Sequence, residues 1–173
     1  LAGILLVIGM QLSMPESAHA DCPTPSDCPQ SAQVEALTRD LESYSEAMTY
    51  ERYSEAEVLA KRIMEFSIIL NGLESIYSAH ALTNLAFVQL KQTQYETARL
   101  NFEAAIRTVE KVDGILSQEL IQPLQGLGTT ALAVQETDGA RLMFERAVHI
   151  SHVNDGPQNP AQIESLEAIA ETY

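Results

Sequence analysis

Apolar residues recur at intervals of three and four along most of the chain, which is the spacing of one face of an α-helix. From Val34 they continue at Leu37, Leu41, Tyr44 and Met48. No segment shows the sustained alternation of β-branched and aromatic residues that a half-buried strand needs. The pattern predicts an all-α protein with helices at about 34–49, 53–69, 76–91, 95–110, 118–133 and 137–152.

The helices are expected to form repeats. The segment ARLNFEAA at 98–105 returns forty-two residues later as ARLMFERA at 140–147. Self-similarity at such a period predicts stacked helix pairs that bury their apolar faces against one another. The units lie at 31–72, 73–114 and 115–156, and 157–173 is an incomplete fourth, so we expect the array to continue beyond Tyr173.

Turn and cap residues follow the same period. Each unit is expected to end at an Asx-Gly pair, because glycine readily adopts positive φ, and three residues later an oxygen-bearing side chain can cap the next helix. The pairs are Asn71-Gly72, Asp113-Gly114 and Asp155-Gly156, and the caps are Ser75, Ser117 and Asn159. In the third unit Pro123, Gly126 and Gly128 are expected to loosen or kink the helix.

The first twenty residues are typical of a secretory signal. An apolar run at 1–10 is followed by Ala18-His19-Ala20, with small residues where signal peptidase cleaves. The basic beginning of such a signal is missing. The alternative is a buried or membrane helix, but about ten apolar residues are too few for a bilayer of roughly 30 Å. We therefore predict export, to a bacterial periplasm, with no membrane insertion after cleavage; Asp21 argues against a lipid anchor.

Residues 21–30 are predicted to be a Pro-rich linker that contains the two cysteines, Cys22 and Cys28. A pair this close in an exported protein is expected to form a disulfide. The alternative is two unpaired thiols, and the five-residue separation does not fit a zinc site.

The formal net charge of −14 makes a nucleic-acid partner improbable, because the ten Lys and Arg are scattered rather than clustered. No nucleophile elbow, phosphate-binding loop or metalloprotease motif occurs, so we expect no enzyme and no cofactor. His149-x-x-His152 is the one metal-like spacing, but histidines near a helix C-terminus are favoured by the helix dipole. We predict no metal site.

The motifs of the second unit resemble the tetratricopeptide repeat. They are Leu82-x-x-Leu85-Ala86 and Tyr95-x-x-Ala98-x-x-x-Phe102-x-x-Ala105, and the forty-two-residue period resembles the kinesin light chain variety. The resemblance covers about 34–173 and implies a right-handed α-solenoid of antiparallel helix pairs. In the third unit, Thr137 stands where the second unit has the aromatic Tyr95. The first unit fits the repeat only if the turn between its two helices is one residue shorter.

The resemblance further implies that the first helix of each pair lines a concave, peptide-binding surface. The residues expected there are His80, Thr83, Asn84, Phe87, Lys91, Gln122, Gln125 and Thr129. The alternative is that Asn84 and Phe87 are ordinary exposed residues with no role in binding. The predicted function is a non-enzymatic scaffold that binds a peptide or protein; the alternative is a structural adaptor segment of a larger protein whose catalytic or membrane domain lies beyond residue 173.

Overall fold

The computed structural model describes residues 29–157 and 159–173, and this part of the chain forms α-helices, short 3₁₀ turns and no strand. The elements are α1 (Gln30–Thr49), α2 (Tyr53–Asn71), α3 (Ile76–Lys91), α4 (Tyr95–Val112), η2 (Gln118–Leu120), α5 (Ile121–Ala133), α6 (Thr137–Asp155), η3 (Pro160–Gln162) and α7 (Ile163–Ala170). The predicted all-α class is confirmed. The predicted signal at 1–20 and the Cys22–Cys28 disulfide lie outside the described residues.

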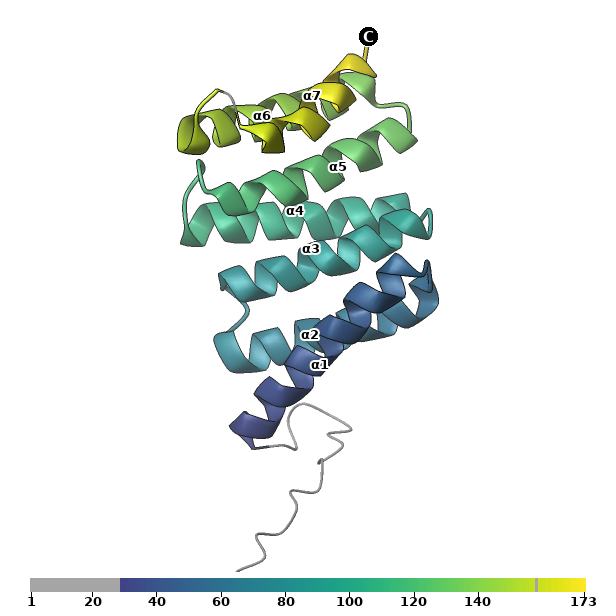
Figure 1. Ribbon diagram of the computed structural model, residues 1–173, viewed down its shortest axis with the longest axis vertical. Helices are drawn as coiled ribbons and strands as arrows, with labels where there is room; N and C mark the ends of the chain where they lie inside the picture. Colours follow the sequence, from purple (N-terminus) through teal and green to yellow (C-terminus); the bar gives the residue numbers. More distant parts are fainter. Residues whose placement is uncertain (1–28, 158) are drawn as a thin grey trace, which may run out of the picture.

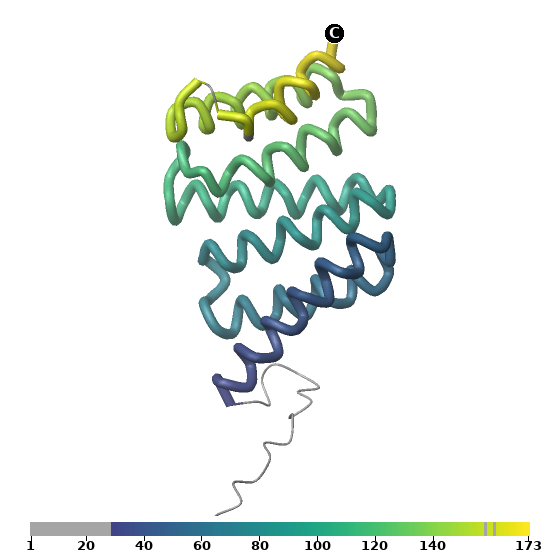
Figure 2. Tube along the Cα trace, viewed as in Figure 1, coloured from purple at the N-terminus to yellow at the C-terminus, as the bar shows by residue number. Residues whose placement is uncertain are grey.

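The helices stack in sequence order along the long axis of the molecule (Figure 1). Each helix packs against the next one, and α3 also contacts α5. The chain therefore runs from the α1–α2 pair at one end to α7 at the other (Figure 2). We call α1, α3, α5 and α7 the A helices, and α2, α4 and α6 the B helices. The arrangement is a helical-repeat solenoid.

The turns between units follow the predicted register. Gly72, Gly114 and Gly156 have φ values of +82°, +96° and +85°. Ser75 Oγ accepts a hydrogen bond from the Ser78 N–H, and Ser117 Oγ accepts one from the Glu119 N–H. These contacts confirm glycine stops at all three turns and side-chain caps at the two serines.

The turns inside the units also repeat, at residues that sequence analysis did not single out. Glu51, Thr93 and Gln135 have φ values of +57°, +61° and +65° and lie forty-two residues apart. In the first unit the Arg52 N–H donates to the Ala47 carbonyl, and the matching bond recurs in the other two units. The first unit therefore has a turn of the same length as the others, and the expected one-residue shortening is wrong.

The starts of α1 and α5 differ from the sequence prediction, and α2, α4 and α6 end two or three residues later than expected. α1 begins at Gln30 rather than near Val34. The sequence prediction started too late because the first turn of the helix is polar and carries no apolar period, although Gln33 and Ala36 are buried. α5 runs unbroken from Ile121 to Ala133, so Pro123 does not interrupt it. Pro123 is the third residue of that helix, where the backbone N–H has no partner within the helix in any case.

The core is formed where consecutive units meet. Leu120, Leu124 and Ile150 are fully buried in one cluster that joins α3, α4, α5 and α6. Ala86, Ala98 and Phe102 form a second cluster, with the large ring beside two small residues. Packing of a large residue beside small ones lets neighbouring helices approach closely.

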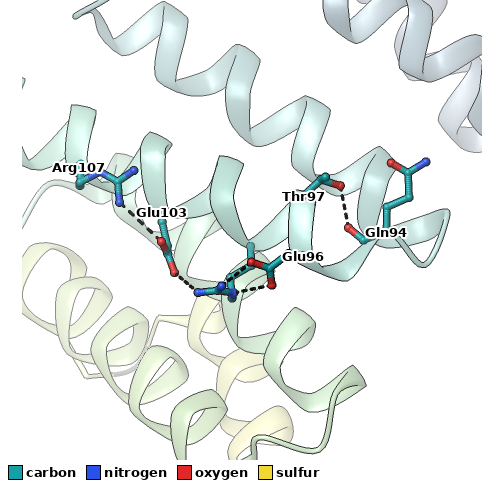
Figure 3. Close-up of polar contacts among 6 residues, drawn as sticks. Gln94, Glu96, Thr97, Glu103 and Arg107 are labelled. Carbon is teal, nitrogen blue, oxygen red and sulfur yellow. Dashed lines mark hydrogen bonds and ion pairs between the residues drawn. The ribbon is translucent and has the colours of Figure 1, made fainter.

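The B helices carry most of the positive charge. Eight of the ten Lys and Arg lie on α2, α4 or α6 or at Arg52, which precedes α2. All eight form ion pairs. Figure 3 shows part of one such series on α4, where Arg107 pairs with Glu103. Arg99 extends the series by joining Glu103 to Glu96. The basic side chains of this layer are therefore already engaged within the protein.

Candidate functional site

A cavity of about 600 Å³ opens between three successive A helices. We call it the inner groove. Its apolar wall is built from side chains of α1, α2, α3 and α5, and its polar residues come mainly from α3 and from the η2–α5 segment. The apolar residues are Leu37, Leu41, Ile63, Ala81 and Ile121, and the polar ones are Ser67, Tyr77, His80, Asn84, Gln118, Glu119 and Gln122.

The repeat register places these side chains. His80 and Gln122 occupy the same position of consecutive A helices, forty-two residues apart, and both are exposed in the groove. Tyr77 and Glu119 are related in the same way. Ala81, by contrast, is 2% exposed and forms the floor. A regular solenoid thus presents one row of side chains from each unit to the same surface.

Polar contacts tie each A helix to the next. The Tyr44 hydroxyl on α1 donates to the Asn84 carbonyl on α3 at 2.9 Å. Burial raises the pKa of Tyr44 to about 12, so the hydroxyl keeps the proton that it donates. The Gln125 side chain on α5 donates to Ser165 Oγ on α7 at 2.9 Å. These contacts hold the walls of the groove in a fixed arrangement.

His80 and Glu119 form a polar link between α3 and η2, the 3₁₀ turn that precedes α5. Nε2 of His80 lies 2.6 Å from Oε2 of Glu119, and each side chain is nearly half exposed. A carboxylate only accepts hydrogen bonds, so Nε2 is the donor. Glu119 retains further lone pairs for a second donor. Among the residues that the structure describes, it is the one acid that lines the inner groove.

A second charged contact lies behind the groove, between α1 and α2. Asp40 is 3% exposed, and Nε of Arg62 lies 3.2 Å from its Oδ2. This distance makes Arg62 and Asp40 an ion pair, but the Arg62 N–H is not aligned for a hydrogen bond, so Oδ2 of Asp40 has no hydrogen-bond donor. Burial raises the pKa of Asp40, while Arg62 and Arg39 act in the opposite direction. Asp40 occupies the position that Leu82 and Leu124 hold in the next two units.

Three of the eight residues expected on the concave surface line the inner groove: His80, Asn84 and Gln122. Asn84 offers a side-chain amide that can donate and accept together. Gln125 contacts Ser165 instead, and the exposed Thr129 hydroxyl donates to the Gln125 carbonyl.

The other expected residues lie outside the groove. Thr83 is a correction: it is 4% exposed, and its hydroxyl donates to the Ala79 carbonyl one turn earlier, so it packs inside the array. Phe87 is half-buried and meets Phe102 edge-on, with ring centroids 5.0 Å apart. Lys91 is exposed at the end of α3.

Sequence analysis missed the contribution of the first unit and of the B helix. Leu37 and Leu41 on α1, and Ile63 and Ser67 on α2, line the groove although no concave residue was assigned there. The register could have identified the exposed positions of α1, because the same forty-two-residue offset relates α1 to α3. Whether a B helix reaches the groove depends on how the helix pairs pack against one another. Local sequence patterns do not predict this packing.

A hollow of similar size, about 650 Å³, lies at the turn between the second and third units. It is lined by Asp113–Glu119 and Asn154, and its polar groups already bond one another: Ser117 donates to Asp113, and Asn154 donates to the Leu116 carbonyl. This hollow is the surface of a structural turn, and the inner groove is the stronger candidate for binding.

Candidate metal sites and membrane-spanning helices are both absent from the described residues. No three His, Cys, Asp or Glu side chains there converge in a way that could hold a metal ion, and His149 and His152 are both exposed. None of the helices in 29–157 and 159–173 has the length and apolar character needed to cross a bilayer.

Comparison with known proteins identifies the fold. No protein-family model matches the chain, and no curated protein does. Among solved structures it is similar to the crystal structure of BtubC (BKLC) from P. vanneervenii, with a TM-score of 0.68 and 21% sequence identity. The match covers 83% of this chain and 63% of the BtubC chain. At this identity the similarity shows a shared helical-repeat fold and nothing about activity.

Proposed function

We propose that this protein is a non-enzymatic interaction scaffold that binds a peptide or protein partner in the inner groove. The observation that carries the proposal is the cavity of about 600 Å³ between α1, α3 and α5. It combines an apolar wall with a few polar groups, which is the usual composition of a binding site. The resemblance to tetratricopeptide repeats supports the same surface.

The chemistry of the groove suits an extended chain. Leu37, Leu41 and Ile63 can receive an apolar side chain, while the Asn84 amide can pair with a peptide N–H and carbonyl at once. These residues stand on packed helices whose positions the Tyr44 and Gln125 contacts hold. Such preorganisation reduces the ordering cost of binding.

A peptide-display selection tests the proposal. The wild-type protein is used as bait beside the variant Gln122→Trp, which fills the groove from an exposed lining position. The matched control is Glu145→Trp, at an exposed position of α6 outside the groove. We expect enriched peptides to bind the wild type and the Glu145 variant but to lose at least tenfold in affinity for the Gln122 variant, a loss of about 1.4 kcal/mol.

Circular dichroism melting of both variants establishes that they are folded. Enrichment of peptides that bind all three proteins equally would place binding elsewhere and contradict the proposal. Failure to enrich any peptide would contradict it as well.

We propose that the scaffold acts in an exported compartment, because residues 1–20 are typical of a secretory signal. Fusion of the natural start of the gene to a reporter that is active only after export tests this. The alternative role, as an adaptor within a larger protein, is decided by the length of the natural reading frame.

A further inference from the structure

Charge is divided unequally between the two helix layers. The B helices contain acids and bases in similar numbers, and their bases are paired. The A helices contain only Arg39 and Lys91 besides His80, and neither of these two lines the inner groove. The A helices carry more Asp and Glu than Lys and Arg, with their acids on α1 and α7 and none on α3 or α5, and Glu119 of η2 adds a carboxylate between them.

The repeat register places acids in the same helix rows as the groove residues. Glu35 occupies the row of Tyr77 and Glu119, and Glu42 occupies the row of Asn84. Glu164 occupies the row of His80 and Gln122. These three rows carry no Lys or Arg, whereas the row of Ala81 carries Arg39 on α1.

The acids of these rows are also accessible. Glu35, Glu42 and Glu164 are exposed, and none of the three takes part in an ion pair within the described residues. Glu119, at the groove itself, has His80 as its partner. The groove thus has an apolar wall, one carboxylate at its edge and further carboxylates in the same rows on either side of it.

We propose that the ligand of the inner groove is a basic segment, an extended stretch rich in Lys or Arg that inserts an apolar side chain between the A helices. This rests on the proposed function of the groove and adds the chemistry of its partner. The apolar side chain packs on Leu37, Leu41 and Ile63, and a neighbouring ammonium or guanidinium group donates to Glu119. The unpaired carboxylates raise the local concentration of such a ligand and exclude acidic ones.

Three fluorescein-labelled nonapeptides test the inference directly. They consist of three Lys-Ser-Leu, three Gln-Ser-Leu or three Glu-Ser-Leu triplets, so the apolar content is constant and only the charge changes. Binding to the full chain is measured by fluorescence anisotropy. We expect affinity to fall from the Lys to the Gln to the Glu peptide, and the differences to vanish at about 1 M salt, where the Debye length is ~3 Å.

The variant Glu119→Gln keeps an acceptor for His80 and removes the charge. We expect it to bind the Lys peptide about threefold to fivefold more weakly, the effect of one partly exposed ion pair, and to bind the Gln peptide unchanged. The matched control Glu145→Gln removes a charge from an exposed position on α6 and should not alter the affinity for the Lys peptide by itself.

Equal losses in the two charge variants would show that the whole acidic surface, not the groove, attracts the Lys peptide, and would overturn the inference. So would tighter or equal binding of the Gln or Glu peptide, or no binding of any of the three. The display selection separates these results from the proposed function, because groove-dependent peptides without Lys or Arg would uphold the scaffold and reject only the basic ligand.

Discussion

A Cβ atom on Gly126 would lie 2.2 Å from Cζ of Phe102, so the Phe102 ring of α4 packs directly against the backbone of α5. Gly128 meets Phe144 of its own unit, where an added Cβ would lie 2.7 Å from Cζ of the ring. The first unit inverts the arrangement, because Tyr44 stands at the repeat position of Ala86 and Gly128, and Ala60 stands at that of Phe102 and Phe144. One large residue and one small residue thus fill each interface.

The first prediction is that Gly126→Ala destabilises the protein. Alanine has a higher helix propensity than glycine by about 1 kcal/mol, but the fully buried Phe102 ring must move to admit the methyl group, and overpacking costs about 1 to 3 kcal/mol. We expect a net loss of up to about 2 kcal/mol in the free energy of unfolding and a correspondingly lower melting temperature, measured by thermal unfolding.

The matched control is Gly139→Ala on α6, where an added Cβ has no neighbour within 4 Å. This variant should be as stable as the wild type or slightly more stable. Equal melting temperatures for the two variants would show that the Phe102 ring relaxes without cost.

The second prediction concerns Asp40. Asp40→Leu restores the residue type found at Leu82 and Leu124 and removes a buried carboxylate that lacks a full set of hydrogen bonds. The remaining partner, Arg62, has a side chain that is 39% exposed and can be solvated. We therefore expect a gain of about 1 kcal/mol in the free energy of unfolding, since buried ion pairs are often less stabilising than apolar packing. Denaturant unfolding at neutral pH measures it.

The gain should depend on pH with a defined sign. Because burial raises the pKa of Asp40 above its ordinary value of 3.8, the folded state binds the proton more readily than the unfolded state does. Above the raised pKa, the ionised Asp40 lowers the free energy of unfolding. This destabilisation disappears as the pH falls from the raised pKa towards 3.8, because the carboxyl of the folded state becomes protonated. The stability difference between Asp40→Leu and the wild type should narrow over this interval. A difference that stays constant over this pH interval would be evidence against a buried charge at Asp40.

The sequence predicted the helices because the apolar period, the glycine stops and the serine caps agree in one register. It failed where the first unit departs from that register: Asp40 and Tyr44 replace a leucine and a small residue, and the apolar pattern then appears shifted by one position. The positive φ of Glu51 carries no glycine signal and was missed for this reason. Backbone hydrogen bonds fix that turn, not side-chain identity.

The candidate site could be predicted only in part. The resemblance to tetratricopeptide repeats, applied to the helical register, pointed to His80, Asn84 and Gln122, and these three residues line the inner groove. The same reasoning placed Thr83 on that side, but the packing of α3 between its neighbours turns that position inward. The pairing of His80 with Glu119 joins residues 39 apart in the chain, and only the stacking of α3 against α5 brings them together.

The third prediction is that Cys22 and Cys28 are joined in exported material and that the bond contributes little stability. The loop it closes is short and precedes the array, so it restricts few conformations of the unfolded chain. Mass spectrometry under non-reducing conditions tests the bond. Cys28→Ser should leave the melting temperature within about two degrees of the wild type, since the change expected is well below 1 kcal/mol, and a decrease of many degrees would be inconsistent with a linker outside the core.

The last prediction compares the same repeat position in two units. Leu124 of α5 is fully buried, whereas Leu166 of α7, forty-two residues later, is 50% exposed because α7 packs only on the side of α6 and α5. Leu124→Ala should cost about 2 to 5 kcal/mol of global stability, and Leu166→Ala should cost less than about 1 kcal/mol, because little apolar surface is withdrawn from water there. Amide hydrogen exchange of the 173-residue chain should accordingly be faster throughout Ile163–Ala170 than in α5, reflecting local opening of a helix with one packed face. Protection of α7 equal to that of α5, together with equal costs for the two leucine variants, would mean that α7 is covered in solution by a surface that the described chain does not provide.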